Sequence, residues 1–338
     1  MSIIDKTEKI GKLNLAHLPT PMQKLEVISG ETGKNIWIKR DDLTGVETSG
    51  NKIRKLEYSF YEALDKKADV VITAGGIQSN HARSTAAVAA RLGIRSHLVL
   101  SGHKDAVIEG NYLLDLILGA KVTILDEKKE CISLQTKMEE IAEDYRSSGH
   151  NPYIIPVGAS NGIGNLGYIG AIKEIAEQEK EIGTKFDLIV CAAGSGGTYS
   201  GLYLGNRIYG LDKKIVGITV CDNKDYFEKV SKNIIGETGL ILGEEFETED
   251  LTFIDGYKGL GYAISKDDEL KFISDIASKE GIILDPVYTG KAFYGLYNEI
   301  LKGTFDGYEN ILFIHTGGLY GLFPKQVQLA QILRDVTA

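Results

Sequence analysis

The stretch DLIVCAAGSGGTYSGLYLGNRIY, residues 187–209, decides the fold. Its first seven residues form a short apolar run that predicts a buried strand, and residues 197–209 predict a helix. The turn between them, AAGSGGT at residues 192–198, contains only small residues, so several backbone N–H groups can point at one anion. Neither GxGxxG nor GxxxxGK[ST] occurs in this turn, which weakens a dinucleotide or nucleotide site. The turn suits a phosphate monoester, although a plain glycine-rich turn also fits it.

The same alternation of apolar runs and amphipathic stretches continues through most of the chain. Strands are predicted at residues 69–74, 96–100, 121–125, 153–155 and 214–220, and helices at residues 80–93, 108–118, 132–147 and 225–235. This alternation predicts an α/β fold of parallel sheets that helices cover on both faces. Because no Pro-rich tether divides the chain, two lobes that share a cleft fit better than two separate domains.

Composition restricts the class of protein. Of the 338 residues, 43% are hydrophobic and 25% are charged, which is typical of a globular chain. The net charge of −9 indicates no excess of basic residues that would attract nucleic acid or an anionic membrane, so neither partner is expected. Without a signal peptide or an apolar run of membrane-spanning length, we expect a cytoplasmic protein. Cys131, Cys191 and Cys221 lack CxxC or CxxH spacing, so no metal site is expected; Cys191 and Cys221 are predicted to be buried thiols.

A lysine stands where a helix is predicted to begin. In SGNKIRKL, residues 49–56, Ser49 or Asn51 can cap the helix and Lys52 then lies in its first turn. A cation there opposes the helix dipole, and a dry site would further lower the lysine pKa and favour a nucleophilic amine. Taken alone, however, the segment fits a solvated surface lysine better.

Three further segments carry polar or aromatic side chains next to glycines. In GGIQSNHAR, residues 75–83, Ser79 and Asn80 stand at a helix start and suit a carboxylate, whereas His81 is either a general base or, more commonly, a structural histidine. GLGY at residues 259–262 and DPVYTGK at residues 285–291 present Tyr262, Tyr288 and Thr289, which could also be aromatics and a hydroxyl at the core edge. FIHTGG, residues 313–318, predicts a strand that runs into a helix start.

Taken together, these segments resemble the pyridoxal-phosphate enzymes of the tryptophan-synthase β-like fold, fold type II. The resemblance is narrower still to the branch that contains D-cysteine desulfhydrase and 1-aminocyclopropane-1-carboxylate deaminase. Eight motifs occur in family order: LPTPMQKLE, IWIKRDDLTG, SGNKIRKLEY, TAGGIQSNHAR, GNYLLD, AAGSGGT, LDPVYTGKA and HTGG. The resemblance implies pyridoxal 5'-phosphate as cofactor, a small amino acid as substrate and a homodimer.

The resemblance also implies roles for individual residues. Lys52 matches the family's Schiff-base lysine, and Asn80 matches the residue that binds the 3-oxygen of the cofactor. Ser79 matches a residue for the substrate carboxylate or for proton transfer, and Tyr262 and Tyr288 match the two tyrosines that face the substrate. Tyr288, Thr289 and Thr316 are expected near the pyridine ring. The phosphate loop matches Gly194, Ser195, Gly196, Gly197 and Thr198.

Two positions distinguish the reactions of this branch. The deaminases of the branch have motifs similar to DPVYEGK and HLGG, whereas the desulfhydrases have motifs similar to DPVYTGK and HTGG. This sequence has Thr289 and Thr316 at the two positions, as the desulfhydrases do. A carboxylate near the pyridine nitrogen makes the ring a strong electron sink, which opening a cyclopropane needs and expelling a thiolate does not. We therefore expect β-elimination on D-cysteine that gives pyruvate, hydrogen sulfide and ammonia. Cysteate sulfo-lyase activity, cyclopropane deamination and an inactive cofactor-holding or metabolite-sensing protein are the alternatives.

The resemblance and the order of the segments predict the domain organisation. The Lys52 and AAGSGGT segments must meet at one cofactor although about 140 residues separate them. We therefore predict a large cofactor-binding domain from residues 1–54 and 166–338, and a smaller inserted α/β domain from residues 55–165.

Overall fold

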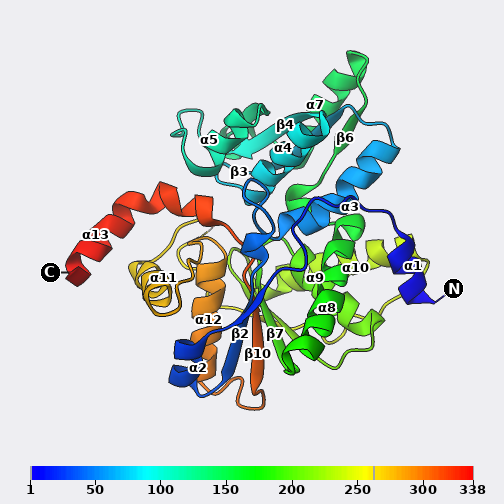
Figure 1. Ribbon diagram of the computed structural model, residues 1–338. Coiled ribbons are helices and arrows are strands. Elements are labelled where there is room, and N and C mark those ends of the chain that lie inside the picture. Colours follow the sequence, from blue (N-terminus) through cyan, green and yellow to red (C-terminus); the bar gives the residue numbers. More distant parts are fainter. Residues whose placement is uncertain (1, 262, 338) are drawn as a thin grey trace.

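The computed structural model describes residues 2–261 and 263–337, and its strands form two sheets (Figure 1). The six-stranded sheet has the order β1-β2-β10-β7-β8-β9 and the four-stranded sheet the order β5-β4-β3-β6. The strands of the larger sheet are β1 (Met22–Lys24), β2 (Asn35–Lys39), β7 (Leu188–Ala193), β8 (Lys214–Thr219), β9 (Phe253–Ile254) and β10 (Asn310–Ile314). Those of the smaller sheet are β3 (Val70–Gly76), β4 (Arg95–Ser101), β5 (Lys121–Leu125) and β6 (Pro152–Ile154).

Helices cover both sheets. They are α1 (Ile3–Lys9), α2 (Glu26–Thr32), α3 (Lys52–Asp65), α4 (Asn80–Leu92), α5 (Gly110–Ile117), α6 (Glu127–Glu130), α7 (Leu134–Ser147), α8 (Gly162–Ile182), α9 (Gly197–Ile208), α10 (Lys224–Leu242), α11 (Asp267–Glu280), α12 (Thr289–Leu301) and α13 (Gln326–Thr337). Short 3₁₀ helices are η1 (Asp41–Leu43), η2 (Val157–Ala159) and η3 (Leu319–Lys325). Within the described part of the chain, no helix is long and apolar enough to cross a bilayer.

The predicted α/β fold is confirmed, with one departure from an all-parallel arrangement. Every described pair of neighbouring strands is parallel except β1 and β2, which pair antiparallel at the edge of the larger sheet. Only a short segment containing α2 connects these two strands, and a parallel crossover needs a dozen residues or more. The strand–turn–helix unit at residues 187–209 is present as β7 and α9.

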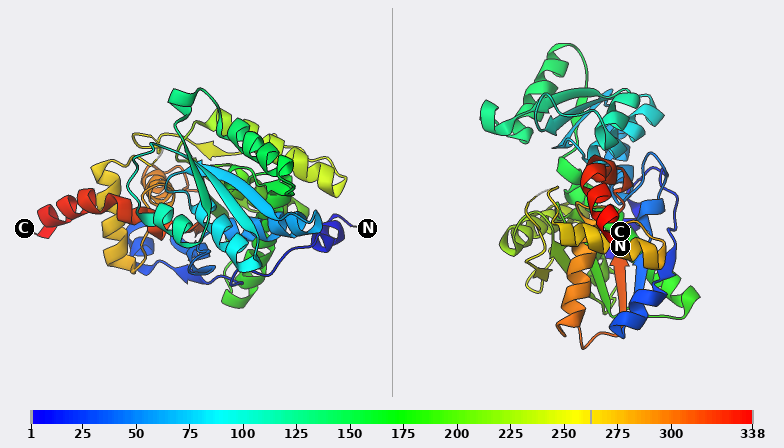
Figure 2. Two further views of the ribbon diagram at one scale, coloured as in Figure 1. Left: turned by 90° about the horizontal axis from the view of Figure 1, so that it is seen from above. Right: turned by 90° about the vertical axis from the view of Figure 1, so that its left-hand side faces the viewer.

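Strand β7 shows how the larger lobe is layered. Leu188 and Val190 pack with α2, α11 and α12 on one face, whereas Ile189 and Cys191 pack with α8, α9 and α10 on the other. Figures 1 and 2 show these two helical layers on either side of the sheet. Because both faces are covered, the strand is apolar throughout rather than alternating.

The smaller lobe sits above the larger one in Figure 1, and helix α3 lies between them. Side chains of α3 and α4 pack on one face of the small sheet and those of α7 on the other. Helix α3 also packs on α8 of the larger lobe, where a Cβ at Gly167 would lie 2.3 Å from the carbonyl oxygen of Arg54. Since α3 contacts both lobes, the predicted domain boundaries at residues 54/55 and 165/166 stay a prediction.

Candidate active site

A cavity lies between the lobes, where the carboxyl ends of β3, β7 and β10 face the starts of α3 and α4. It consists of two adjoining hollows of about 380 and 550 Å³. The predicted residues that line it are Lys52, Ser79, Asn80, Gly194, Ser195, Gly196, Thr198, Tyr288 and Thr316. Gly197 and Thr289 are not among the lining residues, and Tyr262 lies outside the described residues. The structure thus brings together segments that are far apart in the sequence.

The glycine loop after β7 forms one wall. Gly196 has a φ of +80°, which only glycine adopts without strain, and a Cβ at Gly194 would lie 2.8 Å from the ring of Tyr288. Gly196 is also the N-cap of α9, and no side chain caps the helix. The first N–H groups of α9 are therefore available to an anion, as the sequence predicts. Cys221, predicted to be buried, is half-buried and donates its S–H to the carbonyl of Gly194 at 3.4 Å.

Lys52 begins α3 and reaches the cavity from the opposite side. The preceding residue, Asn51, occupies the N-cap position but does not cap the helix; its amide instead donates to the hydroxyl of Thr198 at 2.8 Å. This hydrogen bond joins the start of α3 to the start of α9. Among the described residues, the Lys52 ammonium has no hydrogen-bond partner, and desolvation lowers its pKa to about 8 despite the opposing charge of Asp285. The amine is therefore available for chemistry in the cavity.

Ser79 and Asn80 stand at the start of α4, as expected. The hydroxyl oxygen of Ser79 caps the helix by accepting from the N–H of Ala82 at 3.1 Å, which leaves its O–H free to donate. Asn80 lines both hollows, and its amide oxygen accepts from Asn111 at 2.9 Å. Its side-chain N–H groups are thereby oriented as donors.

His81 is fully buried beside these residues. The hydroxyl of Thr73 donates to the carbonyl of Ile155 at 2.7 Å, so it accepts from Nε2 of His81 at 2.8 Å. Burial lowers the pKa of His81 well below its usual value, so the ring is neutral. These contacts favour the structural histidine over the general base.

Tyr288 and Thr289 follow a buried carboxyl group, Asp285. This group accepts from the N–H of Val287, Tyr288 and Thr289 at 2.9, 3.0 and 2.7 Å. The Thr289 hydroxyl donates to Asp285 at 2.8 Å and accepts from its N–H at 2.8 Å. Thr289 thus lies behind the cavity wall and is committed to Asp285, whereas Thr316 lines the cavity itself. Direct contact of Thr289 with a bound ring stays a prediction from the sequence.

Comparison with known proteins identifies the family. The family model described as "Pyridoxal-phosphate dependent enzyme" matches residues 13–317. The chain belongs to this family. It is 44% identical over 330 residues, 95% of this chain and 81% of the relative, to the mitochondrial bifunctional D-cysteine desulfhydrase/1-aminocyclopropane-1-carboxylate deaminase of Arabidopsis thaliana. It is 36% identical, over 97% of this chain and all of the relative, to the D-cysteine desulfhydrase of Serratia proteamaculans.

Solved structures agree with this assignment. The crystal structure of an ACC deaminase homologue superposes with a TM-score of 0.90 at 43% identity, covering 98% of this chain and 99% of that one. A threonine deaminase from T.th. superposes with a TM-score of 0.64 at 17% identity over 88% of this chain and 92% of that one, and so shows the fold alone. The protein is a pyridoxal-phosphate-dependent lyase with the type II fold.

The cavity fits this cofactor. The start of α9 is uncapped, and a Cβ at Gly194, Gly196 or Gly197 would come within 2.8 Å of a neighbouring side chain, so only glycine fits this loop, which suits a phosphate group. Lys52 offers an amine of lowered pKa on the opposite wall, where an aldehyde would be captured. Asn80 offers amide N–H donors between the two.

Lys55 is a site residue that the sequence analysis missed. It is fully buried, and its ammonium lies 3.1 Å from the Ser160 hydroxyl, which is 2.8 Å from the hydroxyl of Ser195 in the glycine loop. A Cβ at Gly197 would lie 3.0 Å from the Lys55 nitrogen, so this amino group lies directly behind the loop. Burial and the neighbouring Lys52 lower the pKa of Lys55 well below its usual value. The spacing in the sequence could have predicted this position. Residues three apart share one face of a helix, and Lys55 follows Lys52 by three.

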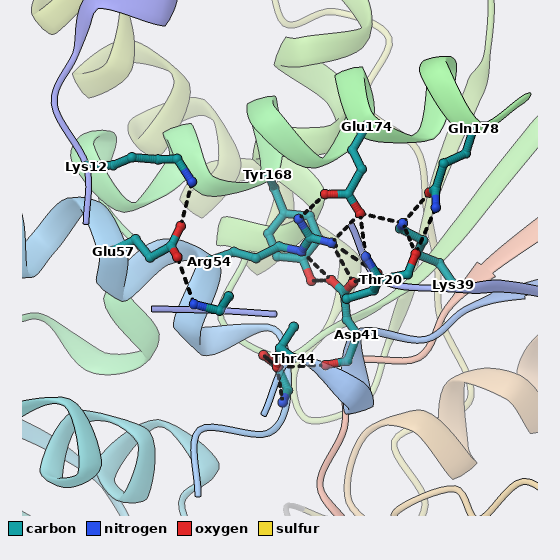
Figure 3. A network of polar contacts seen from close by, with 12 residues as sticks. Lys12, Thr20, Lys39, Asp41, Thr44, Arg54, Glu57, Tyr168, Glu174 and Gln178 are labelled. Carbon is teal, nitrogen blue, oxygen red and sulfur yellow. Dashed lines mark hydrogen bonds and ion pairs between the residues drawn. The ribbon is translucent and has the colours of Figure 1, made fainter. Parts of the chain in front are cut away.

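An ion-pair network fixes α3 on the larger lobe (Figure 3). Arg54, two residues after Lys52, donates to both oxygens of Asp41 at 2.8 and 2.9 Å and to both oxygens of Glu174 on α8 at 2.9 Å. Lys39 on β2 donates to Glu174 at 2.5 Å, and Tyr168 on α8 donates to Asp41 at 2.5 Å. The position of Lys52 is thereby tied to β2, η1 and α8.

The lowered pKa of Lys52 predicts how the apoenzyme takes up its cofactor. We expect the rate of covalent capture of pyridoxal phosphate to rise about tenfold per pH unit below pH 8 and to level off above it, because only the neutral amine attacks. Stopped-flow absorbance between pH 6 and 10 measures this rate, with Lys52→Ala as the control without covalent capture. A rate that keeps rising to pH 10 would show an ordinary lysine.

Proposed function

We propose that the protein catalyses β-elimination on D-cysteine: D-cysteine and water give pyruvate, hydrogen sulfide and ammonia. The observation that carries the proposal is the pair of hydroxyls at Thr289 and Thr316, where the deaminases of the resembled branch have Glu and Leu. Thr316 lines the same cavity as Lys52. Thr289 is an uncharged residue whose hydroxyl donates to the buried Asp285, so neither threonine brings a carboxylate to the site. The names of the D-cysteine desulfhydrase relatives support the same reaction.

We assign the catalytic work as follows. When bound, pyridoxal phosphate supplies an electron-withdrawing ring that stabilises the charge left on Cα when its proton is removed. Gly194, Ser195, Gly196, Gly197 and Thr198 hold the phosphate. These residues, with Asn80, orient the cofactor toward Lys52.

We assign proton transfer to side chains outside the phosphate loop. Either the neutral amine of Lys52 or a relay of Ser79 and a tyrosine, Tyr262 or Tyr288, accepts the Cα proton. Ser79, whose hydroxyl oxygen already accepts from Ala82, donates its O–H to the substrate carboxylate. The thiolate then leaves from Cβ without needing a strong electron sink, which suits a ring edge lined by the neutral Thr316.

The second candidate is deamination of 1-aminocyclopropane-1-carboxylate. It is favoured by the bifunctional Arabidopsis relative at 44% identity and by the ACC deaminase homologue at a TM-score of 0.90. Cysteate sulfo-lyase activity is a further elimination of the same type. Assays of sulfide, pyruvate and 2-oxobutanoate with D-cysteine, L-cysteine, β-chloroalanine, cysteate and the cyclopropane acid separate these reactions. Absence of any turnover, with the cofactor bound, would leave a cofactor-holding or sensing protein.

Substitution of the two threonines tests the reaction choice. We expect Thr289→Glu with Thr316→Leu to lower sulfide release at least about tenfold, because a change of one pKa unit near the ring is worth that factor in a rate. The variant places a carboxylate beside Asp285 and removes the hydroxyl from the cavity wall, and some ring opening can appear. Steady-state assays of sulfide and 2-oxobutanoate measure both reactions, and the effects of the single variants should not add.

Thr289→Ser with Thr316→Ser is the matched control, since it keeps both hydroxyls and should keep sulfide release within a few fold of wild type. Wild-type protein that deaminates the cyclopropane acid as fast as it consumes D-cysteine would contradict the threonine-based choice.

We also propose a homodimer, as the family resemblance implies. Light scattering of the cofactor-loaded protein should give twice the 36.9 kDa of one chain. A mass of one chain at micromolar concentration would contradict it. Cytoplasmic location and the absence of nucleic-acid partners stay predictions from the sequence.

A further inference from the structure

Lys291 is a buried cation that holds main chain rather than a carboxylate. It is the third residue of α12 and is fully buried. Its ammonium donates to three backbone carbonyls, those of Lys258 at 2.8 Å, Gly261 at 2.8 Å and Ile264 at 3.1 Å. An ammonium group has three N–H donors, so these carbonyls satisfy it completely. Among the described residues, no carboxylate forms an ion pair with it.

The position is electrostatically unfavourable for a cation. The first turn of a helix carries partial positive charge, and burial removes the water that would otherwise solvate an ammonium. The three carbonyl contacts offset these costs. Their partners all lie in one short segment, residues 258–264, so the lysine acts on that segment specifically.

The segment has little regular structure of its own. Gly259, Gly261 and Ala263 have φ values of +65°, +145° and +56°, and a single β-bridge joins Gly261 to Ile264. Such a path is not self-supporting, because it lacks the repeated hydrogen bonds of a helix or a ladder. The Lys291 ammonium therefore holds this segment by hydrogen bonds to carbonyls that both precede and follow position 262 in the sequence.

The same region is tied to the start of α12 a second time. The Ser265 hydroxyl donates to the carbonyl of Pro286 at 2.8 Å, three residues before α12 begins. The resemblance assigns the two substrate-facing tyrosines to these two segments. Residues 258–261 and 263–265 are thus held against residues 285–291, of which Tyr288 lines the cavity.

We propose that Lys291 is a positioning residue of the active site: its ammonium sets the main-chain path of residues 258–261 and 263–264, on which the proposed proton transfer by Tyr262 depends. The proposal rests on the proposed function, in which Tyr262 and Tyr288 face the substrate. It is independent of cofactor attachment, which belongs to Lys52.

Chemical rescue provides the first test. Lys291→Ala removes the atoms of one n-propylammonium ion, whereas Lys291→Met fills most of the same volume without charge. We expect kcat for D-cysteine to fall about 10- to 100-fold in both, because displacement of a catalytic group by about 1 Å costs up to that factor. n-Propylammonium should restore Lys291→Ala and leave Lys291→Met and wild type unchanged. Lys302→Met, at an exposed lysine just after α12, is the matched control and should retain wild-type kcat. Wild-type kcat in Lys291→Met would overturn the proposal.

Two further measurements separate positioning from general stability. In the Tyr262→Phe background, Lys291→Met should change kcat less than about twofold, since the two residues act as one unit; a full multiplicative loss would overturn the proposal. Amide hydrogen exchange of the peptide spanning residues 255–268 should accelerate in Lys291→Met and not in Lys302→Met, and an unchanged rate would also overturn it. The proposed function would fail if wild type released no sulfide from D-cysteine. Hydrogen exchange needs no turnover, so it tests the role of Lys291 even in that case.

Discussion

Lys52→Ala should abolish sulfide release, lowering kcat by about 10⁴-fold or more, because covalent catalysis and proton transfer both depend on this amine. None of the buried lysines of the described residues can replace it. Lys39 is bound to Glu174, Lys55 to Ser160, Lys213 to Glu179, and Lys291 to three backbone carbonyls. Lys52, unlike these four, presents its amine to the cavity without a hydrogen-bond partner among the described residues.

Borohydride reduction of the loaded protein followed by peptide mapping measures where the cofactor is attached. The pyridoxyl group should be found on Lys52 in wild type and should be absent from Lys52→Ala. Lys55→Met is the matched control: it should bind the cofactor more weakly, since it removes the amino group that contacts Ser160 behind the phosphate loop, but should still carry the label on Lys52. A label on Lys39, Lys55 or Lys291 in wild type would contradict the assignment.

Arg54→Met should lower the free energy of unfolding by about 3–5 kcal/mol, the effect of removing one partner from a buried ion pair. Arg54 and Asp41 are both almost fully buried, and the substitution leaves two carboxylates with less compensation. Urea unfolding monitored by circular dichroism measures the loss. Arg146→Met, whose exposed partner is Glu143 on the same helix, is the control and should change the free energy by about 0.5 kcal/mol or less.

The same network predicts a dependence on pH. Burial raises the pKa of Asp41 and Glu174, but the charge and hydrogen bonds of Arg54 more than offset this, so both pKa values lie below their usual range. A depressed carboxyl pKa stabilises the fold above the unfolded-state pKa, near 4, and that stability is lost as pH falls below it. Arg54→Met should therefore flatten the loss of stability between about pH 5 and 3. A variant with the wild-type pH profile would show that the network contributes nothing to acid stability.

Activity should respond to Arg54 as well, because the network fixes the helix that Lys52 begins. Lys52 and Arg54 are two residues apart, and Asp41 and Glu174 hold Arg54 from η1 and α8. We expect the folded fraction of Arg54→Met to capture pyridoxal phosphate more slowly than wild type.

The sequence by itself determined the α/β class, the strand–turn–helix unit at residues 187–209 and most of the cavity wall. These features depend on local information: the period of apolar residues sets the element, and Gly194, Gly196 and Gly197 set a backbone path that few other residues allow. Helix α10 was predicted only to residue 235 and extends to Leu242, and α8, α11 and β1 had no prediction. Their ends and existence depend on packing against the larger sheet.

Tertiary structure alone decided which polar groups meet. Arg54 and Glu174 are 120 residues apart, and Lys55 and Ser160 are 105 apart, so no local pattern couples them. Thr289 shows the limit within a single motif, since its neighbours in sequence suggested the cavity, but its hydroxyl is committed to Asp285 behind the wall. Local sequence restricts backbone angles and burial. The hydrogen-bond partner of a buried charge or hydroxyl instead depends on how distant elements pack together. Each such group needs a donor or acceptor within about 3 Å, and only that packing brings one close enough.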